Sequence, residues 1–311
     1  MIYTVTLNPA LDRELTVPTI QYDEVLRATE VRIDYGGKGF NVSRALRALG
    51  QSSVALGFLG GMTGHRFVDG LPCLGIEVDF VEIKDETRTN ISIVTANRSR
   101  YLKVNEPGPE ILPIEQAALL EKIKGLAKPG DWWVLSGNLP RGVPAAFYAQ
   151  MIALVQAAGA RVVLDTSGEP LKHGCEAGPY LVKPNADEAT ELTGIAVITP
   201  EGAREAVKAI VALGAQNVFM SFGKLGALLF DGECAWFAAA PRIEERNPIG
   251  AGDCAVAGLT WGLSQNLPAS EALRWGVASG SAAASLAGTT VGDYALVSAL
   301  VERVEVKPLW V

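Results

Sequence analysis

The alternation of strand-like and helix-like segments along most of this chain is the feature that most restricts its fold. The runs IYTVTL (2–7) and RVVLD (161–165) are typical of buried strands, because they are short and rich in β-branched residues. Residues 42–49 place apolar side chains on one helical face and stop at Gly50, and Pro113 marks another helix start. Strands that alternate with helices predict right-handed crossovers, so we expect an α/β fold with a mostly parallel central sheet.

Four segments interrupt this alternation and predict a second, smaller sheet. They read as strands without intervening helices and cover approximately residues 12–17, 29–35, 88–96 and 100–105. We expect them to form a small antiparallel β-lid on a single domain that spans residues 1–311. Such a sheet could close over a site or serve as the contact between two copies of the chain.

Charge and composition exclude several classes of function. The net charge of −7 argues against non-specific binding to nucleic acid or to a membrane surface, although a locally positive pocket could still bind anions. The N-terminal segment is not typical of a signal peptide, and the 4 cysteines form no CxxC pair, which favours reduced thiols in the cytoplasm. The 2 histidines have no zinc-ligand spacing, and no GxSxG motif supports a histidine-assisted nucleophile.

Polar or glycine-containing loops follow several of the predicted strands. These loops are Ser136-Gly137-Asn138, Asp165-Thr166, Lys183-Pro184-Asn185 and Ser221-Phe222-Gly223. Turn residues are common at strand ends, so each loop alone is weak evidence for a site. In parallel sheets, however, ligands bind at the carboxyl ends of the strands, and together the loops favour one ligand crevice.

Two glycine clusters could bind anions or hydroxyl groups. In DYGGKGFN (34–41), the glycines let the backbone approach a ligand, but the spacing matches neither a Walker A loop nor GxGxxG, and a tight turn explains it equally well. In NPIGAGDC (247–254), Gly250, Ala251 and Gly252 would direct N–H groups from a helix N-terminus toward an anion. Asp253 could be a simple helix cap, but beside this donor array it could also accept a proton during phosphoryl transfer.

The segment KPNADE (183–188) has two interpretations. Asn185 and Glu188 lie three residues apart at a predicted helix start, so their oxygens could hold a hydrated magnesium ion. The same spacing also fits a capping box, which is the interpretation that spacing alone favours. Recognition of a phosphate would need several basic residues to converge, and the candidates are Arg27, Lys38, Arg88, Lys103 and Arg141.

Eight motifs in order resemble those of the PfkB-type carbohydrate kinases of the ribokinase superfamily. They are TLNPALD (6–12), GGKGFN (36–41), RTN (88–90), KVNEPGP (103–109), SGNLPRG (136–142), KPNADE (183–188), SFGKLG (221–226) and GAGD (250–253). Within the family, TLNPALD with KVNEPGP most resembles 1-phosphofructokinases and tagatose-6-phosphate kinases. The resemblance covers the chain nearly from end to end and implies a ribokinase-like three-layer fold.

The resemblance also implies roles for individual residues. It makes Asp253 the catalytic base and places the anion hole at Gly250, Ala251 and Gly252. The implied substrate-binding residues are Asp12, Gly37, Lys38, Asn41 and Asn138, with Arg88, Arg27 and Lys103 for the phosphate that the sugar already carries. The implied nucleotide-binding residues are Lys183, Asn185, Ser221, Gly223 and Gly226, and Glu188 would act on magnesium through water.

Three positions depart from the pattern of the family. Asn138 stands where the family usually has serine, which changes a substrate contact. Pro248 stands where threonine is common, and Cys254 where a small residue is usual. None of these changes removes the base or the anion hole.

The resulting hypothesis is a cytoplasmic kinase that uses ATP and Mg²⁺ to convert fructose 1-phosphate to fructose 1,6-bisphosphate. A monovalent cation such as K⁺ is a further candidate cofactor. Tagatose 6-phosphate and fructose 6-phosphate are alternative substrates. We expect a homodimer formed through the lid, with no nucleic-acid or membrane partner. A catalytically silent sugar-phosphate or nucleotide sensor would not need Asp253, and a dinucleotide-dependent oxidoreductase would need a GxGxxG motif after the first strand, which is absent.

Overall fold

The computed structural model describes residues 1–310, and the larger of its two sheets has 11 strands. These strands are β1 (Ile2–Thr6), β4 (Val54–Gly60), β5 (Glu77–Val78), β6 (Val81–Ile83), β9 (Trp132–Ser136), β10 (Arg161–Asp165), β11 (Leu181–Val182), β12 (Asn217–Ser221), β13 (Gly226–Phe230), β14 (Ala235–Ala239) and β15 (Glu305–Trp310). Their order across the sheet is β15-β14-β13-β12-β11-β10-β9-β1-β4-β5, and β6 also pairs with β4.

In this spatial order, the neighbouring strands from β5 through β4, β1, β9, β10 and β11 to β12 are parallel. Strands β13, β14 and β15 add an antiparallel edge. The expected mostly parallel sheet is therefore confirmed. Because neighbouring parallel strands point the same way, the carboxyl ends of β1, β9, β10, β11 and β12 meet at one edge. This edge receives the loops that were expected to form the ligand crevice.

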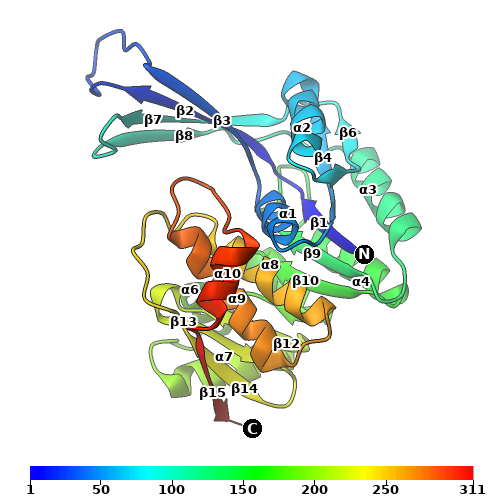
Figure 1. The fold of residues 1–311 in the computed structure, drawn as a ribbon. Helices are drawn as coiled ribbons and strands as arrows, with labels where there is room; N and C mark the ends of the chain where they lie inside the picture. Colours follow the sequence, from blue (N-terminus) through cyan, green and yellow to red (C-terminus); the bar gives the residue numbers. More distant parts are fainter. Residues whose placement is uncertain (311) are drawn as a thin grey trace.

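Helices cover both faces of the large sheet (Figure 1). The helices are α1 (Lys38–Ala48), α2 (Gly61–Cys73), α3 (Pro113–Leu126), α4 (Phe147–Ala157), α5 (Gly168–Glu176), α6 (Ala186–Thr193), α7 (Pro200–Leu213), α8 (Ala251–Ser264), α9 (Ala269–Ala284) and α10 (Tyr294–Val301). Helices α3 to α7 pack on one face, and α1, α8, α9 and α10 pack on the other. The result is a three-layer α/β/α architecture, as the resemblance implied.

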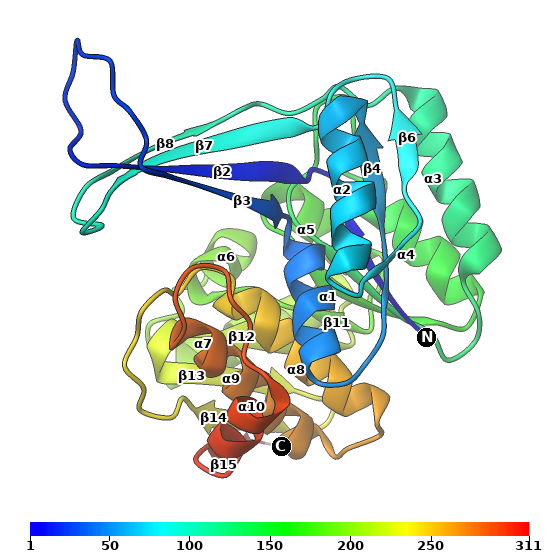
Figure 2. The same cartoon turned by 45° about the horizontal axis from the view of Figure 1, so that its top comes forward.

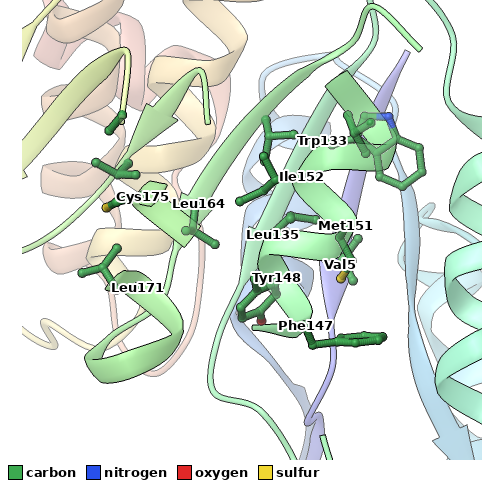
Figure 3. Close-up of a cluster of buried hydrophobic side chains, with 14 of the residues drawn as sticks. Val5, Trp133, Leu135, Phe147, Tyr148, Met151, Ile152, Leu164, Leu171 and Cys175 are labelled. Carbon is green, nitrogen blue, oxygen red and sulfur yellow. The ribbon is translucent and has the colours of Figure 1, made fainter. Parts of the chain in front are cut away.

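The core between β9, β10 and helix α4 shows why the layers hold together. Figure 3 shows Phe147, Met151 and Ile152 of α4 packed toward Leu135 of β9 and Leu164 of β10. All five side chains are buried. Burial of each such side chain contributes about 1.5–3 kcal/mol, so this layer fixes the strand ends that carry the site.

The smaller sheet has four strands and projects from the body of the protein (Figure 2). Its strands are β2 (Ala10–Val17), β3 (Glu30–Gly36), β7 (Arg88–Thr95) and β8 (Tyr101–Asn105), in the order β3-β2-β7-β8. The pairs β2–β3 and β7–β8 are antiparallel, as expected, whereas the central pair β2–β7 is parallel. The strand bounds lie close to those expected from the sequence.

The two faces of this small sheet differ in chemistry. The register places Ile33, Ile91 and Val104 in one row across the sheet, with the exposed Arg13 of β2 between Ile33 and Ile91. A second row holds Val31 and Leu102, with apolar residues of β2 and β7 between them. Because side chains alternate along a strand, these five named apolar residues share one face, and all are exposed. The opposite face carries polar residues such as Asp12, Asn90 and Asp34, and Asp34 bonds to Arg44 of α1 in the body.

Among the helices of residues 1–310, none combines the length and the apolar character that crossing a membrane requires.

Candidate active site

The two glycine-rich loops meet at the carboxyl edge of the large sheet. GGKGFN forms the start of α1, and GAGD forms the start of α8. Asn41 Nδ2 donates a 2.8 Å hydrogen bond to Asp253 Oδ2, which joins positions 212 residues apart in the chain. Two motifs that were read separately in the sequence therefore belong to one site.

The N-terminus of α8 is free to bind an anion. Gly250 is its N-cap residue with φ 81°, a left-handed conformation that favours glycine, and no side chain of residues 1–310 caps the helix. A Cβ atom at Gly252 would have no neighbour within 4 Å among the described residues. Packing within the protein therefore does not require glycine at 252, and the open space suits close approach of a ligand to the helix N–H groups.

Asp253 is a buried carboxyl group with properties suited to a base. Its side chain lies in the first turn of α8, and the residue is 7% exposed. Burial, with a smaller contribution from the negative charge of Asp165, raises the pKa of Asp253 to about 6 against the opposing effects of Lys38, Asn41 and Lys183. A base with a pKa close to neutral accepts a proton efficiently and is still largely ionised at neutral pH.

An ion cluster lies under the two loops, and its centre was not among the expected site residues. Asp165 is fully buried at the end of β10, and its Oδ1 accepts from Lys38 Nζ at 3.1 Å and from Lys183 Nζ at 3.2 Å. Burial alone would raise the pKa of Asp165, but the two lysines outweigh this effect and leave it lowered. The sequence had shown Asp165 only as one residue of a strand-end loop, because its lysine partners come from distant segments.

A cavity of about 730 Å³ adjoins the anion hole and has the size of a nucleotide site. Five expected residues line it, whereas Lys183 and Asn185 do not: the five are Ser221, Gly223, Gly226, Ala251 and Gly252. The far wall comes from α9 and consists of Val277, Gly280, Ser281 and Ala284. Sequence reasoning missed this wall, because small residues on a buried helix also fit ordinary helix packing.

Asn185 and Glu188 form the capping box that their spacing favoured. Asn185 Oδ1 accepts from Glu188 N at 2.8 Å, and Glu188 Oε2 accepts from Asn185 N at 2.8 Å. Within residues 1–310, no group of three or more His, Cys, Asp or Glu side chains is arranged to hold a metal ion. A magnesium ion here would therefore depend mainly on ligand phosphates and water, with the carboxylate of Glu188 held in a fixed orientation beside it.

The polar face of the lid carries the expected sugar-binding residues. Asp12 Oδ1 accepts from Asn90 Nδ2 at 2.9 Å, and burial raises the pKa of Asp12 while Asn90, Lys103 and Arg88 oppose this effect. Arg88 donates to the carbonyl oxygens of Asn8, Pro9 and Glu106 at 3.0, 3.3 and 3.4 Å.

Two other expected substrate-binding residues, Arg27 and Asn138, lie in exposed loops apart from this group. Arg27 is exposed in the loop between β2 and β3, and Asn138 is exposed in the loop after β9. Neither makes a contact that fixes its role. The structure thus brings Asp12, Arg88 and Lys103 together and leaves Arg27 and Asn138 outside this group.

The unusual residues around Asp253 do not disturb its loop. The carbonyl of Pro248 accepts from Ala251 N at 3.2 Å, and Asn247 Oδ1 accepts from Ile249 N at 3.1 Å, so the turn is closed without a threonine hydroxyl. Cys254 is buried, and burial raises the pKa of its thiol to about 12. Its thiol is therefore inert at neutral pH.

Comparison with known proteins gives consistent matches over nearly the whole chain. The profile of the pfkB family of carbohydrate kinases matches residues 6–294. The 1-phosphofructokinase of Bacillus subtilis (strain 168) is 40% identical over 284 residues, which cover 91% of this chain and 92% of that protein. The 1-phosphofructokinase of Borreliella burgdorferi is 35% identical over 285 residues, with coverages of 91% and 92%.

Solved structures match as well. Phosphofructokinase-2 of Escherichia coli in complex with potassium gives a TM-score of 0.91 at 34% identity, covering 97% of this chain and 98% of that chain. The same enzyme has also been solved in complex with fructose-6-phosphate and as a tetrameric inhibited form.

Proposed function

This chain belongs to the pfkB family of carbohydrate kinases, and we propose that it transfers the γ-phosphoryl group of ATP to fructose 1-phosphate, giving fructose 1,6-bisphosphate. The observation that carries the proposal is the position of Asp253, a buried carboxylate beside an open helix N-terminus and bonded to the second glycine loop. The sugar phosphate is chosen because several relatives at 35–40% identity carry the name 1-phosphofructokinase.

The proposed reaction is an in-line phosphoryl transfer. Asp253 accepts the proton of the C6 hydroxyl as that oxygen attacks the γ-phosphorus, and the bond between this phosphorus and the bridging oxygen of ADP breaks. The N–H groups at the start of α8 and the ammonium group of Lys38 stabilise the charge on the transferred group. Asn41 holds the Asp253 carboxylate in position through its 2.8 Å bond.

Recognition of the sugar is proposed for the polar face of the lid. Asp12 would accept hydrogen bonds from sugar hydroxyl groups, and Arg88 and Lys103 would bind the phosphate that the substrate already carries. Arg88 now donates to three backbone carbonyls, and a phosphate would compete for the same donors with a stronger, charge-assisted bond.

ATP and Mg²⁺ are proposed as the co-substrate and its metal. The cavity beside the anion hole would take the nucleotide, with the adenine against the apolar wall of α9. Bound Mg²⁺ would neutralise charge on the phosphates, and Glu188 is the residue proposed to hold its water shell. A dependence on K⁺ is a further proposal, supported by the potassium complex of the Escherichia coli relative.

The lid is proposed as the contact of a homodimer. Its exposed face carries apolar side chains from β3, β7 and β8 around Arg13 of β2, an arrangement that a second copy of the same sheet could cover. The tetrameric form of the Escherichia coli relative makes a tetramer the alternative assembly.

We further propose a cytoplasmic location, where ATP and sugar phosphates occur and where unpaired thiols such as Cys73 stay reduced.

An ADP-release assay tests the function. Purified protein with ATP, Mg²⁺ and fructose 1-phosphate should release ADP, and chromatography should identify fructose 1,6-bisphosphate as the other product. Fructose 6-phosphate is the second candidate substrate, since the Escherichia coli relative was solved with it, and tagatose 6-phosphate is the third. Absence of ADP release with all three would remove the substrate proposal and favour a sensor on the same fold.

A further inference from the structure

The buried ion cluster under the site joins three elements of the fold through one carboxylate oxygen. Lys38 belongs to the first turn of α1, Asp165 ends β10, and Lys183 follows β11. Both ammonium groups bond to Asp165 Oδ1, at 3.1 and 3.2 Å. Asp165 and Lys183 are almost completely buried, whereas the Lys38 side chain is 38% exposed and reaches the open site.

The surroundings of Asp165 are polar. Thr6 and Ser136 are its neighbours at the same level of β1 and β9. The hydroxyl oxygens of both, and Oδ2 of Asp165, are buried and lack a hydrogen-bond partner within residues 1–310. A carboxylate in such a place is costly unless it is paired, and here two lysines are needed to keep it ionised.

We propose that Asp165 is a positioning residue, which holds the ammonium groups of Lys38 and Lys183 at the floor of the site between the two glycine loops. This inference rests on the proposed phosphoryl transfer and deepens it. Both positive charges lie near enough to the first turn of α8 to act on the charge of Asp253, so they would also act on a phosphoryl group bound at that helix start. Without Asp165, both lysine side chains would lose the partner that orients them.

The same cluster controls the charge around Asp253. The groups that face Asp253 are Lys38 of α1, Asp165 of β10 and Lys183 after β11, and Arg44 of α1 and Glu188 of α6 act on its neighbours Cys254 and Lys38. Asp165 repels a negative charge on Asp253, whereas Lys38 and Lys183 attract it. Removing Asp165 and removing Lys38 should therefore change proton binding at Asp253 in opposite directions.

The test compares Asp165→Asn and Lys38→Met with Asp131→Asn as a matched control. Asp131 is also a buried carboxylate paired with an ammonium group, the amine of Met1 at 2.9 Å, but it precedes β9 at the opposite end of the sheet. For each protein, kcat and kcat/KM are measured against pH and against Mg²⁺ concentration. We expect kcat to fall roughly 10²-fold in Asp165→Asn, with the acid limb of kcat/KM moved to lower pH. In Lys38→Met the limb should move to higher pH, and in Asp131→Asn it should not move.

A second readout does not depend on turnover. The Asp165 charge contributes to a raised pKa of Lys38, so an amine-reactive reagent at fixed pH should label Lys38 faster in Asp165→Asn than in the wild type or in Asp131→Asn. Peptide mass spectrometry measures this rate. If the wild-type protein phosphorylates no sugar phosphate, the proposed function fails, while the labelling still decides the role of Asp165.

Three results would overturn the inference. The first is an unchanged acid limb and unchanged Lys38 labelling in a folded Asp165→Asn protein. The second is a large rise in the Mg²⁺ requirement of Asp165→Asn without a shift of the limb, which would assign the carboxylate to the metal. The third result applies if Asp165→Asn does not fold, when Lys38→Met becomes the deciding variant. It is an acid limb of kcat/KM that stays at the wild-type pH in Lys38→Met.

Discussion

At the scale of single residues, the site depends on how burial and neighbouring charges act on Asp253. Its carboxyl group is buried, close to the Asp165 carboxylate, and has one hydrogen-bond donor in Asn41. Burial and the Asp165 charge raise its pKa to about 6, well above the usual value for aspartate, although the Asn41 bond opposes this effect. The raised pKa improves the group as a base and also destabilises the folded protein when the group is ionised.

The first prediction concerns Asp253→Asn. The amide keeps the bond to Asn41 but cannot accept the substrate proton, so kcat should fall by about 10²- to 10⁴-fold while ATP binding is retained. Steady-state kinetics and calorimetric titration with ATP measure the two properties. Turnover close to the wild-type value would contradict the role of Asp253 as the base.

The second prediction concerns stability in the same variant. The folded pKa of Asp253 is about 6, above its unfolded value. The folded protein therefore loses stability as the pH rises from the unfolded pKa through the folded pKa, because the buried group becomes ionised. The difference between the folded and unfolded pKa values corresponds to a loss of at most about 3 kcal/mol in the free energy of unfolding above pH 7. Asp253→Asn should therefore be more stable than the wild type at pH 8 and not at pH 4, as urea unfolding at both values can show. Equal stability gains at both pH values would argue against a raised pKa.

The third prediction concerns the pH dependence of the wild-type reaction. The ionised form of Asp253 is the base, so kcat/KM should decrease below about pH 6 as the group becomes protonated. A pH–rate profile in buffers of constant ionic strength measures this limb. An acid limb near pH 4 would mean that the carboxyl group keeps the ordinary pKa of an exposed aspartate.

At the scale of elements, the two glycine motifs form the starts of α1 and α8, and these helix starts lie side by side. The motifs predicted an anion site at each helix start, and the structure joins them through Asn41 and Asp253. The sequence could not show that Lys183 points into the same cluster, because Lys183 is separated from Asp165 by a helix and a loop. Its position follows from the parallel pairing of β10 with β11.

The fourth prediction concerns the start of α8. A side chain at 252 has open space in the folded protein, so Gly252→Val should fold, but the added methyl groups would occupy the place proposed for the phosphoryl group. We expect a normal melting temperature with a loss of kcat/KM of about 10²-fold or more. A variant that melts normally and keeps full activity would show that the transferred group binds elsewhere.

The fifth prediction concerns the lid. Ile33→Glu places a carboxylate among the apolar residues of the exposed lid face, opposite Arg13 of β2, and the variant should be monomeric if that face joins two copies. Val68→Glu on α2 is the matched control, because Val68 and Ile33 are both 41% exposed. Light scattering after size-exclusion chromatography measures the mass of each protein. An unchanged dimer or tetramer in Ile33→Glu would place the contact on another surface.

At the scale of the whole molecule, the sequence was sufficient for the architecture and for the edge of the sheet at which the polar loops meet. The alternation predicted a parallel sheet, and the strand-end loops predicted the edge where Ser221 and Gly223 line the cavity. The α9 wall and the Asp165 cluster could not be predicted, because both depend on contacts between segments far apart in the chain. The parallel β2–β7 pair also escaped prediction, since local patterns show that strands exist but not which strands pair.

The most direct test of the central proposal is the ratio of kcat/KM values for fructose 1-phosphate, fructose 6-phosphate and tagatose 6-phosphate at saturating MgATP. The ratio compares how strongly the lid and the Asp253 site together stabilise the transition state for each sugar phosphate. We predict the highest value for fructose 1-phosphate, with fructose 1,6-bisphosphate as the product. A higher value for either of the other two sugar phosphates would contradict the proposed substrate and retain only the kinase class.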